Sequence, residues 1–144
     1  MPVGKRAWFG VYVDRLLMEQ FDTTTLVRDG DGDVPFSKGT SACFVTVEPR
    51  PLGVRVWGMA ATGIKPTAAV LREVNELNQQ ATLAKVVLAG DRVWVEVRLP
   101  ADQVSPRSLR RACQQVCTIA DDIGSLFAGV YGGSTPFPVD AQAG

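Results

Sequence analysis

The sequence predicts an α+β domain in which helices pack on an antiparallel sheet. Paired segments of alternating apolar residues are joined by compact turns, which is the pattern of β-hairpins. Three longer segments repeat their apolar residues every three or four positions, as amphipathic helices do. Hairpins pair antiparallel strands. The predicted order of a helix, two or three strands, a helix, two strands and a helix therefore excludes a doubly wound parallel sheet.

The chain of 144 residues is long enough for one domain with a substantial core, without disulfides or metal. Its 15 basic residues equal its 15 acidic residues, so net charge gives no reason to expect a nucleic-acid partner. No apolar run approaches the roughly 18 residues that span a membrane. We therefore expect neither nucleic acid nor a membrane as partner.

The first helical pattern covers residues 8–21, despite Gly10. Its apolar positions are Val11, Leu16, Leu17, Met18 and Phe21. The basic pair and apolar stretch at the N-terminus faintly resemble a signal peptide, but Asp14 and Arg15 interrupt the stretch. An amphipathic helix in a cytoplasmic protein is the better prediction.

Two hairpin patterns follow the first helix. Residues 23–27 and 34–37 flank the sequence DGDGD and predict a strand, a turn and a short return strand. Residues 41–48 and 54–61 predict a second pair around a turn with two prolines. DGDGD also resembles the start of a calcium loop. Because the Gly and the Glu required later in such a loop are missing, a solvated turn is favoured.

The second half of the chain predicts a helix, a hairpin and a final helix. Pro66 suits the first position of the middle helix, and the hairpin joins residues 83–88 to residues 92–99 through a Gly-Asp turn. Ser105 is a candidate N-cap of the final helix, with Pro106 at its first position. The apolar stripe of the middle helix is Val70, Leu71, Val74, Leu77 and Ala81. That of the final helix is Leu109, Cys113, Val116, Ala120, Ile123 and Phe127. The predicted domain covers residues 1–131, and residues 132–144 predict a flexible tail rich in Pro and Gly.

The absence of histidine removes the commonest general base, the commonest metal ligand and every Ser-His or Cys-His nucleophile. Cys43, Cys113 and Cys117 are an odd number without disulfide spacing, which indicates a reducing compartment. Cys113 and Cys117 share a helical face but lack further zinc ligands, so two buried apolar side chains are favoured. No phosphate-binding glycine motif is present. We expect no catalytic residue, no metal, no cofactor and no enzymatic activity.

Charged clusters in the final helix allow a functional and a structural interpretation. Arg107, Arg110 and Arg111 lie near its start, where positive charge opposes the helix macrodipole. They could contact an anion or a partner, although a solvated face is the more common explanation. Asp121 and Asp122 are consecutive and point about 100° apart, so a catalytic pair is not expected.

Strand alternation predicts a candidate binding surface. On the last strand, valines and a leucine would face the helices, and Arg, Trp and Glu residues would face away. If the outward residues of the strand from residue 54 lie on the same side, an exposed patch for a partner results. The patch would consist of Trp57, Met59, Trp94, Arg55 and Arg92. The alternative, in which a helix or loop covers the tryptophans and makes them core, is about equally favoured.

The segment VNELNQQATLAKVVLAGDRVWVEVRLPADQVSPRSLRRACQQV resembles the YbjN family, whose fold is that of type III secretion chaperones. In that family a helix ends in an Asn-containing segment similar to Asn75-Glu-Leu-Asn78. A hairpin with an acidic or Gly turn follows, and then a final helix that Pro or Ser opens. With DGDGD and the strands after it, the likeness covers about residues 8–130. We expect Asn78 to hydrogen-bond backbone groups at its helix C-terminus.

The resemblance implies the order α-β-β-β-α-β-β-α with about five strands, often in a dimer and without a cofactor. Secretion chaperones present apolar surface of their dimers to extended segments of client proteins. We therefore expect a non-enzymatic, homodimeric module that binds a protein or peptide client. The alternative is a small regulatory or ligand-sensing domain of the sensory transduction regulator type, holding a metabolite between sheet and helix.

Overall fold

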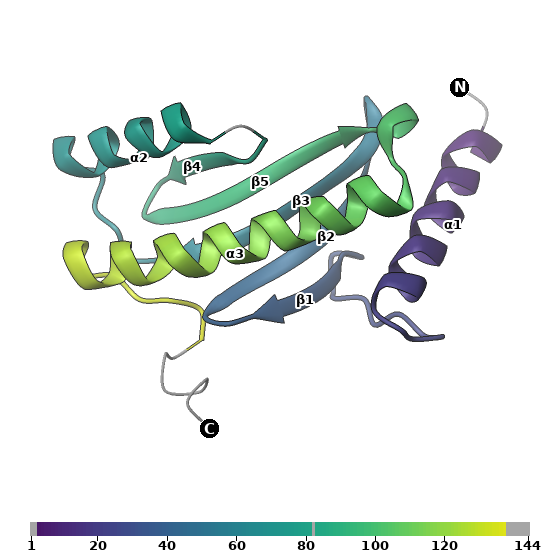
Figure 1. Cartoon of the computed structure of the whole chain (residues 1–144), viewed down its shortest axis with the longest axis horizontal. Coiled ribbons are helices and arrows are strands. Elements are labelled where there is room, and N and C mark those ends of the chain that lie inside the picture. The colour runs from purple at the N-terminus through teal and green to yellow at the C-terminus, as the bar shows by residue number, and fades with distance from the viewer. Residues whose placement is uncertain (1–2, 82, 138–144) are drawn as a thin grey trace.

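The computed structural model describes residues 3–81 and 83–137 of the protein. Five strands form one antiparallel sheet in the spatial order β1-β2-β3-β5-β4 (Figure 1). The predicted α+β class and the order α-β-β-β-α-β-β-α are confirmed. The elements are α1 (Val3–Gln20), β1 (Val34–Lys38), β2 (Ser41–Pro49), β3 (Leu52–Ala61), α2 (Ala68–Gln80), β4 (Lys85–Ala89), β5 (Arg92–Pro100), a 3-10 turn (Ala101–Gln103) and α3 (Pro106–Tyr131).

The core lies between α3 and one face of the sheet. In Figure 1, α3 crosses in front of the central strands, whereas α1 and α2 flank the sheet. Because side chains alternate along a strand, one face of β3 and β5 is apolar throughout and is covered by α3. The buried residues of this face include Val54, Val56, Ala60, Val93, Val95, Val97 and Leu99. The predicted stripe of the final helix is buried as well, together with Ala112, Cys117 and Gly124.

Two glycines let α3 approach β3 closely. A Cβ atom on Gly124 would lie 2.5 Å from the backbone oxygen of Ala60, and one on Gly58 would lie 3.1 Å from Val116 Cγ1 of α3. At its N-terminus, α3 is capped as the sequence predicts. The Ser105 hydroxyl accepts from Ser108 N, the Ser108 hydroxyl accepts from Ser105 N, and proline follows the cap.

α1 begins earlier than predicted and buries a different stripe. It packs on the core through Phe9, Val13, Leu16 and Leu17, whereas Val11 is exposed. The prediction for Val11 was wrong because α1 carries apolar residues on two faces, and periodicity alone does not select which one meets the core. The Tyr12 hydroxyl donates to Val104 O at 3.4 Å and links α1 to the segment before α3. In the described part of the chain, none of the helices is long and apolar enough to cross a membrane.

The predicted strand at residues 23–27 is not formed, and this segment is irregular. A local turn competes with pairing there, because the Thr23 hydroxyl accepts from Thr25 N and donates to Thr25 O. DGDGD forms the predicted turn. Asp29 Oδ1 accepts from the backbone N–H groups of Asp31 and Asp33, both at 3.0 Å.

α2 differs from the prediction at both ends. Thr67, rather than the residue before Pro66, is its N-cap and accepts from Val70 N at 3.3 Å, so Pro66 precedes the helix. Asn78 binds the sheet edge instead of its own helix terminus. Its amide donates to Val86 O at 2.9 Å and accepts from Val86 N at 2.8 Å. Asn78 thereby occupies backbone groups on the free side of β4, and α2 blocks this edge.

The predicted tail, residues 132–144, begins with a segment that is bound to the sheet. Ser134 exchanges two backbone hydrogen bonds with Thr62, and Phe137 N donates to Thr40 O at 3.1 Å. Residues 138–144 lie outside the described residues.

Replacing Gly124 by alanine should destabilise the protein by about 1–3 kcal/mol, because the added methyl group meets backbone that cannot move away cheaply. Gly129→Ala is the matched control on the same helix, since nothing lies within 4 Å of its added Cβ atom. That substitution should stabilise by about 0.5–1 kcal/mol through helix propensity. Urea unfolding measures both variants. An unchanged midpoint for Gly124→Ala would refute the close approach.

Candidate functional site

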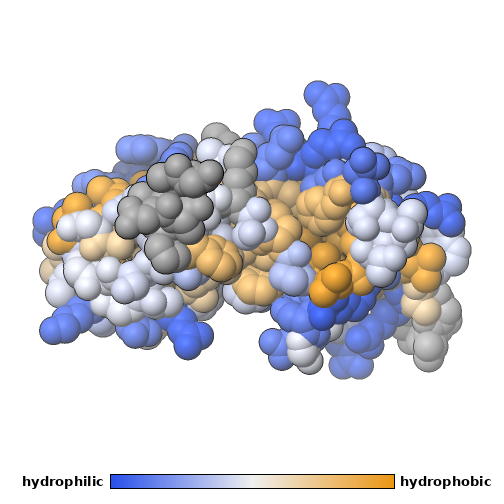
Figure 2. Space-filling view, turned by 90° about the horizontal axis from the view of Figure 1, so that it is seen from below, coloured by the Kyte–Doolittle hydropathy of each residue, from blue (hydrophilic) through white to orange (hydrophobic). Residues whose placement is uncertain are grey.

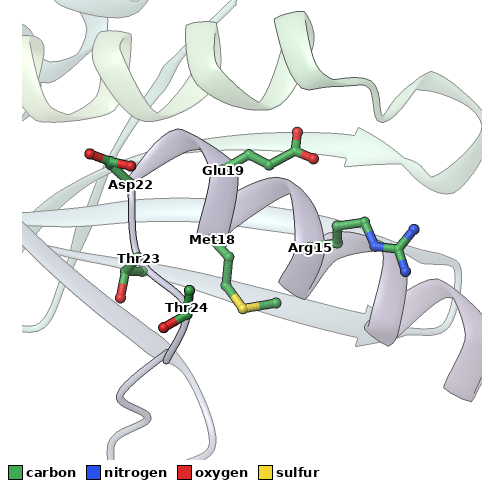
Figure 3. Close-up of a pocket in the computed structure, with 6 residues that line it drawn as sticks. All are labelled: Arg15, Met18, Glu19, Asp22, Thr23 and Thr24. Carbon is green, nitrogen blue, oxygen red and sulfur yellow. The ribbon is translucent and has the colours of Figure 1, made fainter.

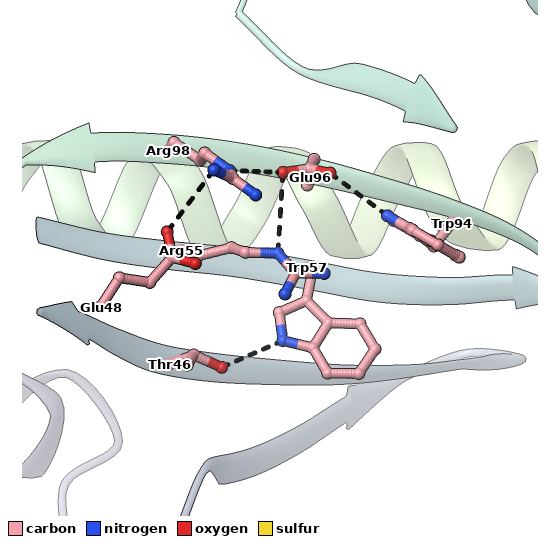
Figure 4. A network of polar contacts seen from close by, with 7 residues as sticks. All are labelled: Thr46, Glu48, Arg55, Trp57, Trp94, Glu96 and Arg98. Atoms are coloured by element: carbon pink, nitrogen blue, oxygen red, sulfur yellow. Dashed lines mark hydrogen bonds and ion pairs between the residues drawn. The ribbon is translucent and has the colours of Figure 1, made fainter. Parts of the chain in front are cut away.

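The sheet face opposite α3, which we call the outer face, contains the five residues that the sequence predicts as a binding patch. Register pairs Met59 with Trp94 and Arg55 with Arg98 across β3 and β5. Trp57 lies on the same face of β3 as Met59, and Arg92 lies on the same face of β5 as Trp94. Figure 4 views this face with α3 behind the sheet. The five predicted residues therefore share one face, on which none of the described helices packs.

An apolar stripe crosses the outer face from β2 to β4. Ala42, Met59, Trp94 and Val87 stand side by side in register on four adjacent strands. Phe44 and Trp57 form the next cross-strand pair. We call Phe44, Trp57, Met59, Trp94 and Val87 the outer-face stripe. All five side chains are partly exposed, so sheet neighbours shield them only in part.

Trp57 is held in one orientation by its neighbours. Its ring stacks on Phe44 with centroids 4.5 Å apart, and the Arg55 guanidinium lies 4.9 Å from the ring centroid. Its Nε1 donates to the Thr46 hydroxyl at 3.1 Å. Because these contacts fix the ring before any partner arrives, binding there would lose little side-chain entropy.

Beside the stripe, a buried carboxylate neutralises two arginines (Figure 4). Arg55 and Arg98 are directly opposite each other, an arrangement that repels unless a negative charge intervenes. The Glu96 side chain is only 6% exposed and accepts from Arg98 Nε at 2.8 Å. Arg55 Nε lies 3.6 Å from the same oxygen and interacts through charge alone.

Two more groups complete this cluster. Trp94 Nε1 donates to the other oxygen of Glu96 at 3.2 Å, and Arg98 also approaches Glu48 at 3.9 Å. Burial by itself raises the pKa of Glu96. Hydrogen bonds from Arg98 and Trp94, with the charge of Arg55, outweigh burial and bring the pKa below its ordinary value of 4.5. Glu96 is therefore ionised at neutral pH and orders one edge of the stripe.

The outer edge of β1, which pairs with no described strand, adjoins the stripe. The β1–β2 turn has two residues, so Pro35 and Ser37 direct their backbone groups away from β2. Proline is tolerated there because its missing N–H has no strand to pair with. A hollow of about 260 Å³ lies at this edge, lined by residues of β1 and β2 and by Phe137. Seen from the β1 side, hydrophobic surface is exposed next to α1 (Figure 2).

Another hollow, of about 620 Å³, lies at the end of α1 (Figure 3). Charged residues, Arg15, Glu19 and Asp22, line it together with Met18 and two threonines. These side chains point in different directions, so they do not converge on a single substrate atom. The arrangement provides no general acid or base at a reaction centre.

The three thiols lie in the core, as predicted for Cys113 and Cys117. Burial raises the pKa of Cys113 to about 11, and such a thiol is protonated and unreactive at neutral pH. Cys117 Sγ donates to Cys43 Sγ at 3.3 Å. This hydrogen bond lowers the pKa of Cys43, against the opposing effect of burial. Across residues 3–81 and 83–137, no group of three His, Cys, Asp or Glu side chains could hold a metal ion.

Sequence reasoning missed Phe44, Thr46 and Glu96 as members of the site. Glu96 carried a usable signal, because it alternates with Trp94 and Arg98 on the outward face of the last strand. The sequence contains no comparable signal for Phe44 and Thr46. Their proximity to Trp57 depends on the β2–β3 register, which a turn with two prolines does not specify in advance.

Chains from two solved complexes have a similar fold. A chain of the ExsC–ExsE complex matches with a TM-score of 0.65 and 10% identity, over 81% of this chain and 94% of that one. A chain of the HopA1–SchA chaperone–effector complex matches with a TM-score of 0.63 and 11% identity, over 85% and 99% respectively. At these identities the likeness shows the fold alone.

A comparison of the sequence with models of protein families identifies the family of the chain. A family model described as T3SS (YopN, CesT) and YbjN peptide-binding chaperone 1 matches residues 7–139. The chain belongs to this family, and the resemblance to YbjN and secretion chaperones is confirmed. No curated protein gives a significant sequence match.

Replacing Glu96 by glutamine should destabilise the protein by about 1–3 kcal/mol at pH 7, because two arginines lose their buried counter-charge. A carboxyl with a lowered folded pKa stabilises fully above its unfolded pKa, and its contribution is lost as pH falls through the folded value. The difference between wild type and variant should therefore be constant from pH 7 to about 5.5 and shrink below about 4.5. Urea unfolding across this range measures it. A difference that grows on acidification would contradict the assignment.

Proposed function

We propose that the protein is a non-enzymatic chaperone that binds an extended segment of a client protein on its outer face. The observation that carries the proposal is the outer-face stripe, an ordered apolar surface on a sheet face that none of the described helices covers. Membership of a peptide-binding chaperone family supports it. So does a fold shared with a chaperone–effector complex.

The two sheet edges differ in a way that favours β1 as the entry side. On β4, Asn78 already occupies the N–H and C=O of Val86. On β1, Ser37 retains outward backbone groups, and the neighbouring hollow is bounded by Phe44 and Phe137. A client can therefore cross the stripe or add a strand to β1, where backbone bonds provide affinity and pockets provide specificity.

Trp94→Ala should weaken client binding by about tenfold or more, because it removes the centre of the stripe. The probe is a 12-residue peptide selected on the immobilised protein from a random phage-displayed library, with its affinity measured by fluorescence anisotropy. Trp57→Ala and Met59→Ala should also weaken binding. Arg55→Ala and Arg92→Ala test the proposed contribution of the flanking guanidinium groups.

Trp8→Ala is the matched control, because Trp8 is a highly exposed tryptophan of α1, outside the outer face. It should leave affinity unchanged. Each variant is checked by urea unfolding, since loss of the Glu96 hydrogen bond in Trp94→Ala costs some stability. Normal affinity in a folded Trp94→Ala protein, or loss of affinity in Trp8→Ala alone, would refute binding at the outer face.

We also propose that the chaperone acts as a cytoplasmic homodimer. Leu71 on α2 is 54% exposed, although it belongs to the predicted apolar stripe, and Val70 is the buried residue of this helix. The same apolar patch on a second copy would cover this side chain in a two-fold symmetric contact. Sedimentation velocity should give a dimer for wild type and a monomer for Leu71→Glu, with Arg72→Glu as the neighbouring exposed control. A wild-type monomer at micromolar concentration would refute the proposal.

A further inference from the structure

The three arginines at the start of α3 have no evident role in stabilising the described fold. Arg107, Arg110 and Arg111 are exposed, and none forms an ion pair with another described residue. No acidic residue occurs between Asp102 and Asp121. A helix N-terminus already carries positive partial charge, so Arg107, in the first turn, destabilises the helix on which it lies. An external anion would relieve this repulsion.

Two of the three arginines line a groove on the α3 side of the sheet. The groove has a volume of about 390 Å³, and Arg107 and Arg111 lie on its α3 side. Leu83 and Leu99 supply apolar surface, and Leu83 is 45% exposed. Arg110 does not line the groove. The site therefore combines two cations with an apolar surface, beyond what the helix terminus alone provides.

Most of the hydrogen-bonding groups that the groove can offer to a ligand are donors. Ser105 and Ser108 bind each other in the capping box, and the Ser108 hydroxyl also donates to Gln103 O at 2.8 Å. Guanidinium groups only donate, and their planar geometry matches a carboxylate in bidentate fashion. The groove is thus complementary in charge and geometry to a carboxylate next to an apolar side chain.

We propose that this groove, lined by Arg107, Arg111, Leu83 and Leu99, binds an acidic segment of the client in extended form. Residues four apart on a helix lie about 6 Å from each other. Residues two apart in an extended peptide lie about 6.6–7 Å apart on one side. Two carboxylates separated by one residue, flanked by a leucine-sized side chain, therefore match the groove. The inference rests on the proposed peptide-binding function and adds a contact on the face opposite the outer-face stripe.

Other occupants fit less well. Nucleic-acid phosphates would satisfy guanidinium groups, but the net charge of zero gives no long-range attraction, and Leu83 and Leu99 have no role in such a contact. A second copy of the chain would bring its own acidic residues. Both occupants are included as outcomes of the experiment below.

The test uses a fluorescein-labelled 12-residue peptide with Leu-Glu-Ser-Asp-Leu at its centre, and an analogue with Gln and Asn in place of the acids. In 50 mM salt, wild type should bind the acidic peptide about tenfold tighter than the analogue, as two ion pairs allow. The double variant Arg107→Gln/Arg111→Gln should lose this preference. Arg110→Gln, the matched control outside the groove, should keep it within about twofold. Raising the salt to 300 mM should reduce the preference.

Several outcomes overturn the inference. Equal affinity for both peptides does so, and so does an equal loss in Arg110→Gln, which would indicate diffuse attraction. Displacement of the probe by a 12-nucleotide oligothymidylate at lower concentration would assign the groove to nucleic acid. A change of oligomeric state in Arg107→Glu/Arg111→Glu would assign it to self-association. If library peptides still bind in a Trp94-dependent way while the acidic preference is absent, this inference fails and the proposed function stands.

Discussion

The packing of α3 on one face of β3 and β5 is the interaction on which the rest of the structure depends. Gly124 and Gly58 permit this close approach, because any side chain at either position would meet the opposing layer. The two-residue period of a strand then places every polar or aromatic residue of β3 and β5 on the other face. The outer face is therefore a direct consequence of how the core is built, and its composition can serve binding without weakening the core.

The outer face is ordered before any partner binds. Trp57 is fixed by Phe44, Arg55 and Thr46, and Glu96 holds Arg55 and Arg98 together although their charges repel. Burying Glu96 costs desolvation free energy, which the hydrogen bonds from Arg98 and Trp94 offset. A rigid apolar stripe beside a neutralised polar cluster suits an extended chain, because little entropy is lost on docking.

Much of the fold was predictable because its signals are local. The Ser105-Pro106 cap, the buried stripe of α3 and the Gly-Asp hairpin each depend on neighbours in sequence, and the structure confirms them. The predictions that failed concern contacts that the apolar periodicity of one segment does not specify. Residues 23–27 form a local hydrogen-bonded turn instead of the predicted strand. Asn78 bound the edge of β4, a contact that only the position of α2 beside the sheet makes possible.

The sequence by itself determined the two faces of each central strand and the absence of histidine-based chemistry, because alternation and composition need no tertiary information. It therefore identified Trp57, Met59 and Trp94 as candidates, but could not say whether they were core or surface. Tertiary structure decided this, since α3 covers only one face of the sheet. It also added Phe44 and Glu96 to the site. Register across strands and the final positions of helices arise from packing between segments far apart in the chain, which periodicity within one segment does not encode.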